Sequence, residues 1–234
     1  MEETIKGNTV GSTNTNFCKI FTEEKDAYIF GLWCADGYHR TSSIGLTNIN
    51  WQLIIKFKDF LEKNFVKDRV KMVIYEPIDK FQENKTSSIK YLKSYKAKNR
   101  AYRIYVNCRP LLRELRQLRN LISKLNKKKV IWAYMAGRFD GDGSIDKQMD
   151  RDLRIVYSNF KETKTDHNLL KKIGFKHEKV YNYRKSKTFC LYISRYETRK
   201  FIKGVYPYSV RMQKLVFVPR RDFSSNKSRT KMIK

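Results

Sequence analysis

The sequence predicts an α+β protein made of two pseudo-symmetric halves, each with an antiparallel sheet and the element order αββαββα. A short motif occurs twice at a fixed offset, and the hydrophobic period then changes in the same order after each copy. Hydrophobic residues make up 41% of the 234 residues, which is enough for a core. We expect the halves at 1–125 and 131–234, with a linker at 126–130.

The repeated motif is AYIFGLWCADG at 27–37 and AYMAGRFDGDG at 133–143, an offset of 106 residues (133 − 27) with six matched positions. Small residues recur every four positions in both copies, and residues four apart share one face of a helix. Each copy therefore predicts a helix, the first at 23–36, with a smooth stripe that lets two backbones approach closely. The stripes consist of Ala27, Gly31 and Ala35, and of Ala133, Gly137 and Gly141.

Each motif ends in Asp-Gly, and the two acids are Asp36 and Asp142. If the two helices pack in parallel, these carboxylates lie side by side at one end of the interface. Two unrelated helices with ordinary glycine C-caps are the alternative. Six matches at one offset disfavour that alternative.

The segments after each motif repeat the same order of predicted elements. The first half gives an extended segment at 38–48, a helix at 51–65, strands at 69–76 and 100–107, and a helix at 109–125. The second half gives 152–159, 163–175, 179–185, 188–195 and 196–205 in the same order. Residues 77–99 are rich in Lys and Ser, and we expect an extended hairpin tip whose lysines contact phosphates.

The charge is strongly positive, because 51 Lys and Arg against 23 Asp and Glu give a net charge of +28. Such a field attracts polyanions, and nucleic acid is the predicted partner. A ribosomal-type or merely soluble basic protein is the alternative. No apolar run approaches the ~18 residues needed to span a bilayer, so we expect no membrane partner.

The four cysteines form no CxxC pair and only three histidines exist, which disfavours a zinc site. A chain of this size with a good core does not need disulfides either. We therefore expect reduced cysteines and an intracellular protein, in the cytoplasm, the nucleoid or an organelle.

The segments IFGLWCADG at 29–37 and MAGRFDGDG at 135–143 resemble the two motif copies of single-chain LAGLIDADG homing endonucleases. The matching residues are Ile29 and Met135 at the first Leu, Gly31 and Gly137 at the first Gly, and Asp36 and Asp142 at the final acid. Three residues depart from the motif: Phe30, Arg138 and Cys34. Cys34 replaces the earlier Asp of the motif, which is usually structural in this family and which Asp140 keeps in the second copy.

The resemblance implies a monomeric, metal-dependent endonuclease that cuts one phosphodiester in each strand of a long, non-palindromic double-stranded DNA site. In such proteins Asp36 and Asp142 would bind the metal, together with the backbone carbonyls of Ala35 and Gly141. Mg²⁺ is the expected ion, with Mn²⁺ able to substitute. The chemistry agrees, because two close carboxylates repel each other and a hard divalent cation relieves that repulsion.

Further site residues are predicted around the acids and on the sheets. Alternate side chains of an antiparallel sheet point one way, and such strands can enter the major groove. The predicted DNA readers are His39, Arg40, Ser42, Tyr181, Tyr183 and Arg184. The polar residues predicted to assist the metal are Asn48 and Asn159, at matching places after their strands, and Lys128 and Lys214. For each of these, a solvated surface residue is the alternative.

Two other functions remain open at this stage. A maturase that binds intron RNA has the same high charge, and similar proteins act in this way. A catalytically inactive DNA-binding regulator would keep the fold but lose its acids. The presence of both Asp36 and Asp142 favours cutting.

Overall fold

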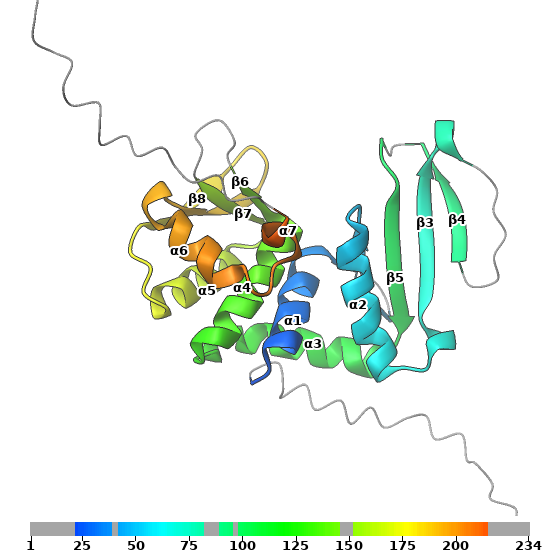
Figure 1. Cartoon of the computed structure of the whole chain (residues 1–234), viewed down its shortest axis with the longest axis horizontal. Helices are drawn as coiled ribbons and strands as arrows, with labels where there is room; N and C mark the ends of the chain where they lie inside the picture. Colours follow the sequence, from blue (N-terminus) through cyan, green and yellow to red (C-terminus); the bar gives the residue numbers. More distant parts are fainter. Residues whose placement is uncertain (1–21, 39–41, 82–88, 96–97, 146–151, 215–234) are drawn as a thin grey trace, which may run out of the picture.

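The computed structural model describes residues 22–38, 42–81, 89–95, 98–145 and 152–214, so the predicted readers His39 and Arg40 lie outside the described residues. Two α+β halves flank a central pair of helices, α1 (Glu24–Asp36) and α4 (Lys128–Asp142) (Figure 1). This confirms the predicted fold class. The predicted linker at 126–130 is short, since α4 already begins at Lys128.

Each half contains one sheet, and the two sheets share a strand order. The N-terminal order is β1 (Gly37–Tyr38), β2 (Ser43–Asn48), β5 (Ala101–Asn107), β3 (Lys71–Pro77), β4 (Ile89–Ser94). The C-terminal order is β6 (Gly143–Ile145), β7 (Leu153–Tyr157), β9 (Thr188–Ile193), β8 (Glu178–Tyr183). Without β4 the two orders are the same, which establishes the pseudo-symmetry.

Strand β4 departs from the predicted hairpin at 77–99. It pairs with β3 in parallel, from Met72 opposite Ile89 to Pro77 opposite Ser94. All other strand pairs in the described residues are antiparallel. A parallel neighbour requires the chain to return to the start of β3 before β4 begins at Ile89. The predicted hairpin tip at 77–99 is wrong, because the two strands of a hairpin are antiparallel whereas β3 and β4 are parallel.

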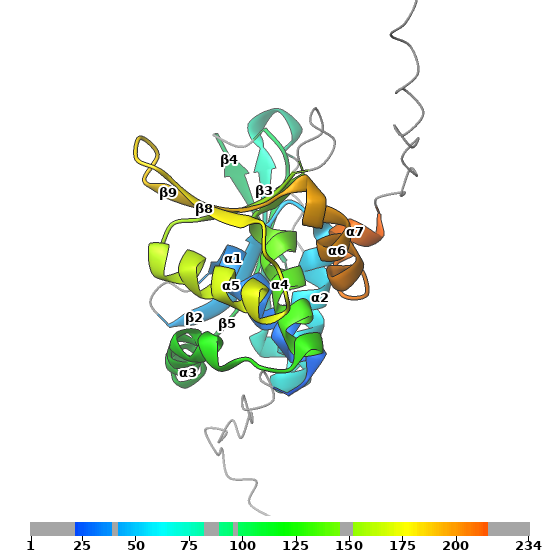
Figure 2. The same cartoon turned by 90° about the vertical axis from the view of Figure 1, so that its left-hand side faces the viewer.

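Among the described residues, helices contact one face of each sheet, and the other face is here called the open face. Helices α2 (Trp51–Asn64) and α3 (Arg109–Leu121) contact the N-terminal sheet, and α5 (Phe160–Lys172) contacts the C-terminal sheet. Helix α6 (Arg195–Val205) packs against α4, and α7 (Val210–Gln213) follows it. Three short 3₁₀ turns, Lys67–Arg69, Ile78–Lys80 and Ile122–Lys124, complete the described elements. Figure 2 shows α5 against β8 and β9. Within the described residues, no helix is long and apolar enough to cross a membrane.

Asparagine caps fix where two of these helices begin. The Asn50 side chain accepts from Gln52 N at 3.1 Å at the start of α2, and the Asn159 side chain accepts from Lys161 N at 2.8 Å at the start of α5. Such caps satisfy backbone N–H groups that a helix leaves unpaired. The cap explains why α5 begins at Phe160, three residues before the predicted helix at 163–175.

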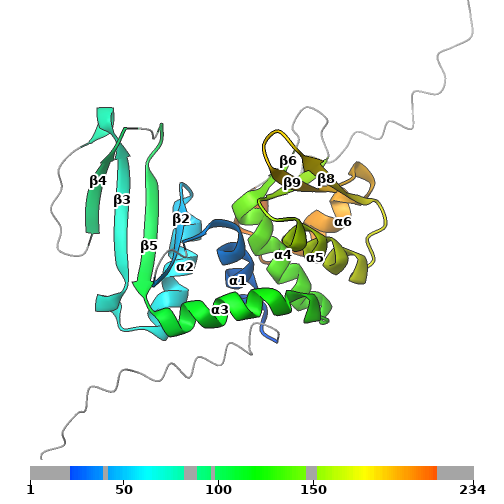
Figure 3. The ribbon, with the colours of Figure 1, turned by 180° about the vertical axis from the view of Figure 1, so that it is seen from behind.

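The core runs through the central helices into both halves. Every residue of α4 from Val130 to Asp140 is buried, which is typical of a helix packed on all sides. Helix α3 crosses from one half to the other (Figure 3). Its Arg119 pairs with Glu162 of α5 at 2.5 Å, while its Leu115 packs in the core of the N-terminal half. The halves therefore share one hydrophobic core.

Candidate metal centre at the helix seam

The interface between α1 and α4, here called the helix seam, brings two backbones into contact. A Cβ atom added to Gly31 would lie 2.1 Å from Tyr134 O, and one added to Gly137 would lie 2.1 Å from Tyr28 O. No side chain fits at these distances. The small-residue stripe predicted from the repeat is therefore the surface along which the two helices meet.

The helices run in parallel along the seam, so their final residues meet at one end. A Cβ atom on Gly141 would lie 2.4 Å from Ala35 Cβ and 3.2 Å from Asp36 Oδ2. The last turn of α4, which ends at Asp142, thus touches the last turn of α1, which ends at Asp36. The two acids of the motif share this end of the seam, as the repeat predicts.

The partly buried setting raises the pKa of both carboxyl groups. Burial is the largest cause at Asp142, where the nearby Asp36 charge adds to the effect and Arg138 opposes it; the resulting pKa is about 6. Burial also raises the pKa of Asp36, against the Asn48 hydrogen bond and the charges of Arg138 and Arg211. A pair of this kind favours a bound cation, because the cation replaces protons that the acids would otherwise hold.

Asn48 is the predicted polar residue that lies directly against an acid. Its Nδ2 donates to Asp36 Oδ2 at 2.5 Å, and its Oδ1 accepts from Asn50 N at 2.7 Å. The second bond fixes the side-chain amide, because it ties Asn48 to the turn that starts α2. Asn48 therefore holds Asp36 in one orientation.

Asn159 does not occupy the matching place in the second half. It caps α5, as Asn50 caps α2, so its structural counterpart is Asn50. The position two residues before the cap is Tyr157, whose hydroxyl donates to Asp166 Oδ2 at 2.9 Å. The predicted pairing of Asn48 with Asn159 is wrong because it counted from the strands rather than from the helix caps.

Of the two predicted lysines, the structure separates Lys128 from the acids, whereas a role of Lys214 stays a prediction. Lys128 is the first residue of α4 and Asp142 is the last, which separates them by about 21 Å at 1.5 Å per residue. Lys128 is therefore at the wrong end of the helix to assist the acids. Lys214 is exposed and follows α7, where its backbone N–H bonds to Arg211 O and Met212 O.

Arg211 is the basic residue that the structure brings to this end of α4. Its Nη1 donates to Gly143 O at 2.8 Å and to Phe139 O at 3.1 Å, so it caps the last turn of the helix. A cation at a helix C-terminus complements the helix dipole. The sequence signal for Arg211 is weak and consists of Ser209, a residue typical of helix N-caps, two positions earlier. The Ser209 Oγ accepts from Met212 N at 3.0 Å at the start of α7.

Arg138 departs from the apolar motif position and is almost fully buried. Its Nε donates to Asp166 Oδ2 at 3.1 Å, and its guanidinium lies 4.5 Å from the centre of the Tyr157 ring. Tyr134 also donates to Asp166, at 3.0 Å. The ion pair with Asp166 compensates the buried charge, although Arg138 Nη1 has no hydrogen-bond partner among the described residues.

The remaining predicted readers lie away from the seam. Tyr181 and Tyr183 are exposed on the open face of β8, where Tyr181 packs edge-on against Tyr192 with ring centres 5.7 Å apart. Arg184 follows in the exposed turn. Ser42 precedes β2, and its carbonyl accepts from Cys108 N at 2.8 Å. A role of these residues in reading DNA stays a prediction.

The donor set at the seam suits magnesium. No group of three or more His, Cys, Asp or Glu side chains that could hold a metal occurs among the described residues, so the seam offers two carboxylates. Mg²⁺ commonly binds one or two carboxylates, keeps several waters and takes phosphate oxygens. Ala35 and Gly141, whose carbonyls precede the acids, adjoin each other at the same place.

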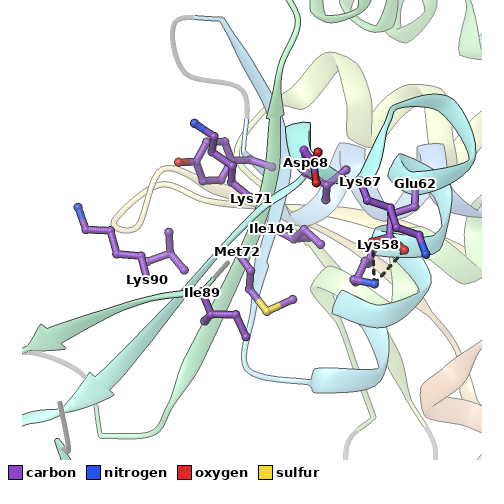
Figure 4. Close-up of a pocket in the computed structure, with 12 residues that line it drawn as sticks. Lys58, Glu62, Lys67, Asp68, Lys71, Met72, Ile89, Lys90 and Ile104 are labelled. Carbon is purple, nitrogen blue, oxygen red and sulfur yellow. Dashed lines mark hydrogen bonds and ion pairs between the residues drawn. The ribbon is translucent and has the colours of Figure 1, made fainter. Parts of the chain in front are cut away.

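A groove of about 860 Å³ lies elsewhere, between the end of α2 and strands β3, β4 and β5 (Figure 4). Apolar Met72, Ile89 and Ile104 line it together with charged residues, and Lys58 is paired there with Glu62 at 2.8 Å. It includes no residue of the seam. The site chemistry therefore belongs to the helix ends and not to this groove.

No protein-family model and no curated protein sequence matches the chain. Solved structures, in contrast, match the chain in fold. I-DmoI in complex with DNA and Mn aligns with a TM-score of 0.55 and 16% identity, over 80% of this chain and 97% of that chain. The chain has the two-domain LAGLIDADG fold.

Two further structures share that fold. An I-DmoI variant with its target DNA in the presence of Mg gives a TM-score of 0.55 at 17% identity, over 82% of this chain and 98% of that chain. The N-terminal LAGLIDADG domain of DUF199/WhiA gives 0.51 at 11% identity, over 83% and 90%. Two proteins with different names thus share the LAGLIDADG architecture, so activity must be argued from the seam residues.

Proposed function

We propose that the protein is a site-specific double-strand DNA endonuclease of the homing type. It hydrolyses one phosphodiester in each strand of a long DNA site and uses a divalent cation held by Asp36 and Asp142. The observation that carries this proposal is the meeting of two helix-end carboxylates at the seam, with Asn48 bonded to one of them.

The cation, Mg²⁺ or Mn²⁺, would activate water and stabilise the leaving oxygen. Side chains of the protein set the orientation and the ionisation of the two acids that would hold this cation. Asn48 orients the Asp36 carboxylate, and the positive charges of Arg138 and Arg211 favour its ionised form. Asp142 has a pKa of about 6, so near neutral pH it can give up its proton when a cation binds.

The two open faces flank the acids and suit a bound duplex. Strands of an antiparallel sheet can enter the major groove, with alternate side chains toward the bases. The faces carry different residues, including Tyr181 and Tyr183 in one half and Arg103 and Tyr75 in the other. Different faces read different half-sites, which supports a non-palindromic target. Both acids come from one chain, which supports a monomer.

The solved complexes of I-DmoI with DNA support a duplex partner and a divalent metal for this fold. The net charge of +28 supports the same partner, because cationic side chains displace counterions from the phosphates. A bacterial, archaeal or organellar intron would be the natural context of such an enzyme.

The test is cleavage of a randomised double-stranded DNA library in Mg²⁺, with EDTA as the blank. The wild type should cut one long sequence, and Asp36→Asn should bind that sequence without cutting it. Asp68→Asn is the matched control, since Asp68 is an exposed carboxylate outside the seam. Binding without cleavage in Mg²⁺ or Mn²⁺ would reject the enzyme and leave a DNA-binding regulator. Preference for intron RNA over every duplex would leave a maturase.

A further inference from the structure

The N-terminal sheet holds an arginine between two tyrosine rings on its open face. The guanidinium carbon of Arg103 lies 4.5 Å from the centre of the Tyr38 ring and 4.9 Å from the centre of the Tyr75 ring. Arg103 Nε donates to Thr47 Oγ1 at 3.3 Å. Two rings and one hydrogen bond therefore fix the plane of this guanidinium.

The strand register places Arg103 on the open face. Its neighbours along β5, Tyr102 and Ile104, belong to the opposite face, where Ile104 is fully buried in the core. Side chains alternate along a strand, so Arg103 points away from the helices. Strand β5 is third of five in the sheet order, which makes Arg103 central on that face.

A glycine allows the rings to gather around this arginine. A Cβ atom on Gly45 would lie 2.7 Å from Tyr105 Cβ, so β2 and β5 approach more closely here than two side chains permit. Tyr105 in turn lies against Tyr38, with ring centres 6.4 Å apart. The polar and aromatic side chains form one platform around Arg103.

Arg103 has no carboxylate partner among the residues that the structure describes. Its terminal Nη groups make no hydrogen bond within that part of the chain, while its Nε is already used. The guanidinium plane of Arg103 is already fixed and its two terminal Nη groups are available, so the side chain loses little conformational freedom when it binds a partner. Arg103 can therefore donate two hydrogen bonds to a pair of coplanar acceptors on a bound molecule.

We propose that Arg103 reads one guanine in the N-terminal half-site through the paired acceptors O6 and N7. This inference rests on the proposed endonuclease function. The guanidinium fork matches these two acceptors in the major groove. A phosphate role fits less well, because phosphates flank the groove, whereas Arg103 lies on the central strand.

The site of reading lies close to the site of cutting. Tyr38 follows Asp36 by two residues, and Thr47 directly precedes Asn48, which bonds to Asp36. Arg103 is thus tied to both segments that hold the N-terminal acid. The guanine belongs to the part of the half-site near the scissile phosphates.

In the second half, the position that matches Arg103 carries no arginine. Val156 corresponds to Thr47, because each directly precedes a matching residue, Tyr157 or Asn48. Thr47 pairs with Arg103, and Val156 pairs with Cys190, so Cys190 occupies the position of Arg103. Cys190 is buried and carries no fork of donors. One half-site therefore contains the guanine contact and the other does not, which makes the target asymmetric at this position.

The test is binding selection from a randomised duplex library, with all proteins carrying Asp36→Asn and Asp142→Asn so that no DNA is cut. Arg103→Lys keeps the charge but removes the fork. We expect it to lower the preference for guanine at one base pair by roughly 10- to 100-fold and to leave other positions unchanged. Tyr75→Leu should weaken the same preference in part, because it removes one ring of the pair.

Lys90→Met is the matched control, since Lys90 lies on the open face of edge strand β4, opposite Val73. It should weaken binding to all sequences alike and reduce the salt dependence, without changing any base preference. If Arg103→Lys and Tyr75→Leu select the same sequence as the parent, the guanine role is overturned while the endonuclease proposal stands. If the parent selects no sequence at all, the proposed function itself fails.

Discussion

The hydroxyl of Tyr28 in α1 donates to Asp140 Oδ2 in α4 at 2.6 Å, and this buried hydrogen bond crosses the helix seam. Asp140 also accepts from Val210 N at 2.7 Å and Arg211 N at 3.2 Å at the start of α7. One carboxylate thus joins both helices to α7. The earlier acid of the second motif copy therefore has a structural role.

Replacing Asp140 should destabilise the fold strongly. Asp140→Ala leaves the Tyr28 hydroxyl and the Val210 N–H buried without an acceptor, and each such group costs about 1–3 kcal/mol. We expect a loss of about 3 kcal/mol or more in the free energy of unfolding, measured by urea titration. Tyr28→Phe, which removes one bond only, should lose about 1 kcal/mol. Equal losses for the two variants would contradict this role.

The seam glycines should tolerate no side chain. Gly31→Ala and Gly137→Ala would each force a methyl group to 2.1 Å from a carbonyl oxygen of the other helix. The backbones must then separate, at a cost of about 3 kcal/mol or more. Gly174→Ala is a fair comparison, because its positive φ of 90° carries strain without a seam contact, and about 1 kcal/mol is expected there. Thermal unfolding of the three proteins would distinguish them, and a seam variant as stable as Gly174→Ala would contradict the close packing.

The acids should make the metal-free protein less stable as pH rises. The folded-state pKa of Asp142 is about 6 against an ordinary 3.8, so the folded protein binds the proton more tightly than the unfolded chain. Stability is then highest below the ordinary value and declines as pH rises toward about 6. At pH 7.5 we expect Asp142→Asn to be more stable than the wild type by about 1–2 kcal/mol in EDTA, allowing for solvent screening.

Magnesium should reverse that order. A cation that binds only the folded state raises the melting temperature of the wild type, and Asp142→Asn should gain much less. The same protonation predicts that the effect of Mg²⁺ fades as pH falls through about 6. Calorimetry at pH 5 and pH 7.5 provides the comparison. An equal Mg²⁺ shift in both proteins would place the cation elsewhere.

Asn48 and Asn159 should behave differently despite their similar sequence positions. Asn48→Ala removes the bond that orients Asp36, and we expect cleavage to fall about 10- to 100-fold while DNA binding is largely kept. Asn159→Ala removes a helix cap and should cost about 1 kcal/mol of stability with normal cleavage. Single-turnover rates and melting temperatures of both variants check this. Similar rates for the two would contradict the assignment.

The sequence predicted the seam well, because a repeat reports a relationship that packing must satisfy. Gly31 and Gly137 marked the contact, and Asp36 and Asp142 marked its end. The polar surroundings could not be predicted in the same way. Arg211 lies 69 residues beyond Asp142 (211 − 142) and reaches α4 only through tertiary packing. Strand β4 was missed because it pairs with β3 in parallel, and a parallel pairing leaves no hairpin-turn signal in the sequence.

The central claim is that the two seam acids together form the cutting centre. The most direct measurement is single-turnover cleavage of the selected target in Mg²⁺ by the wild type, Asp36→Asn and Asp142→Asn, with each strand labelled. The account predicts that either variant binds the target at least as tightly as the wild type yet loses double-strand cleavage by a factor of about 10³ or more. Double-strand cleavage at the wild-type rate by either variant would contradict it.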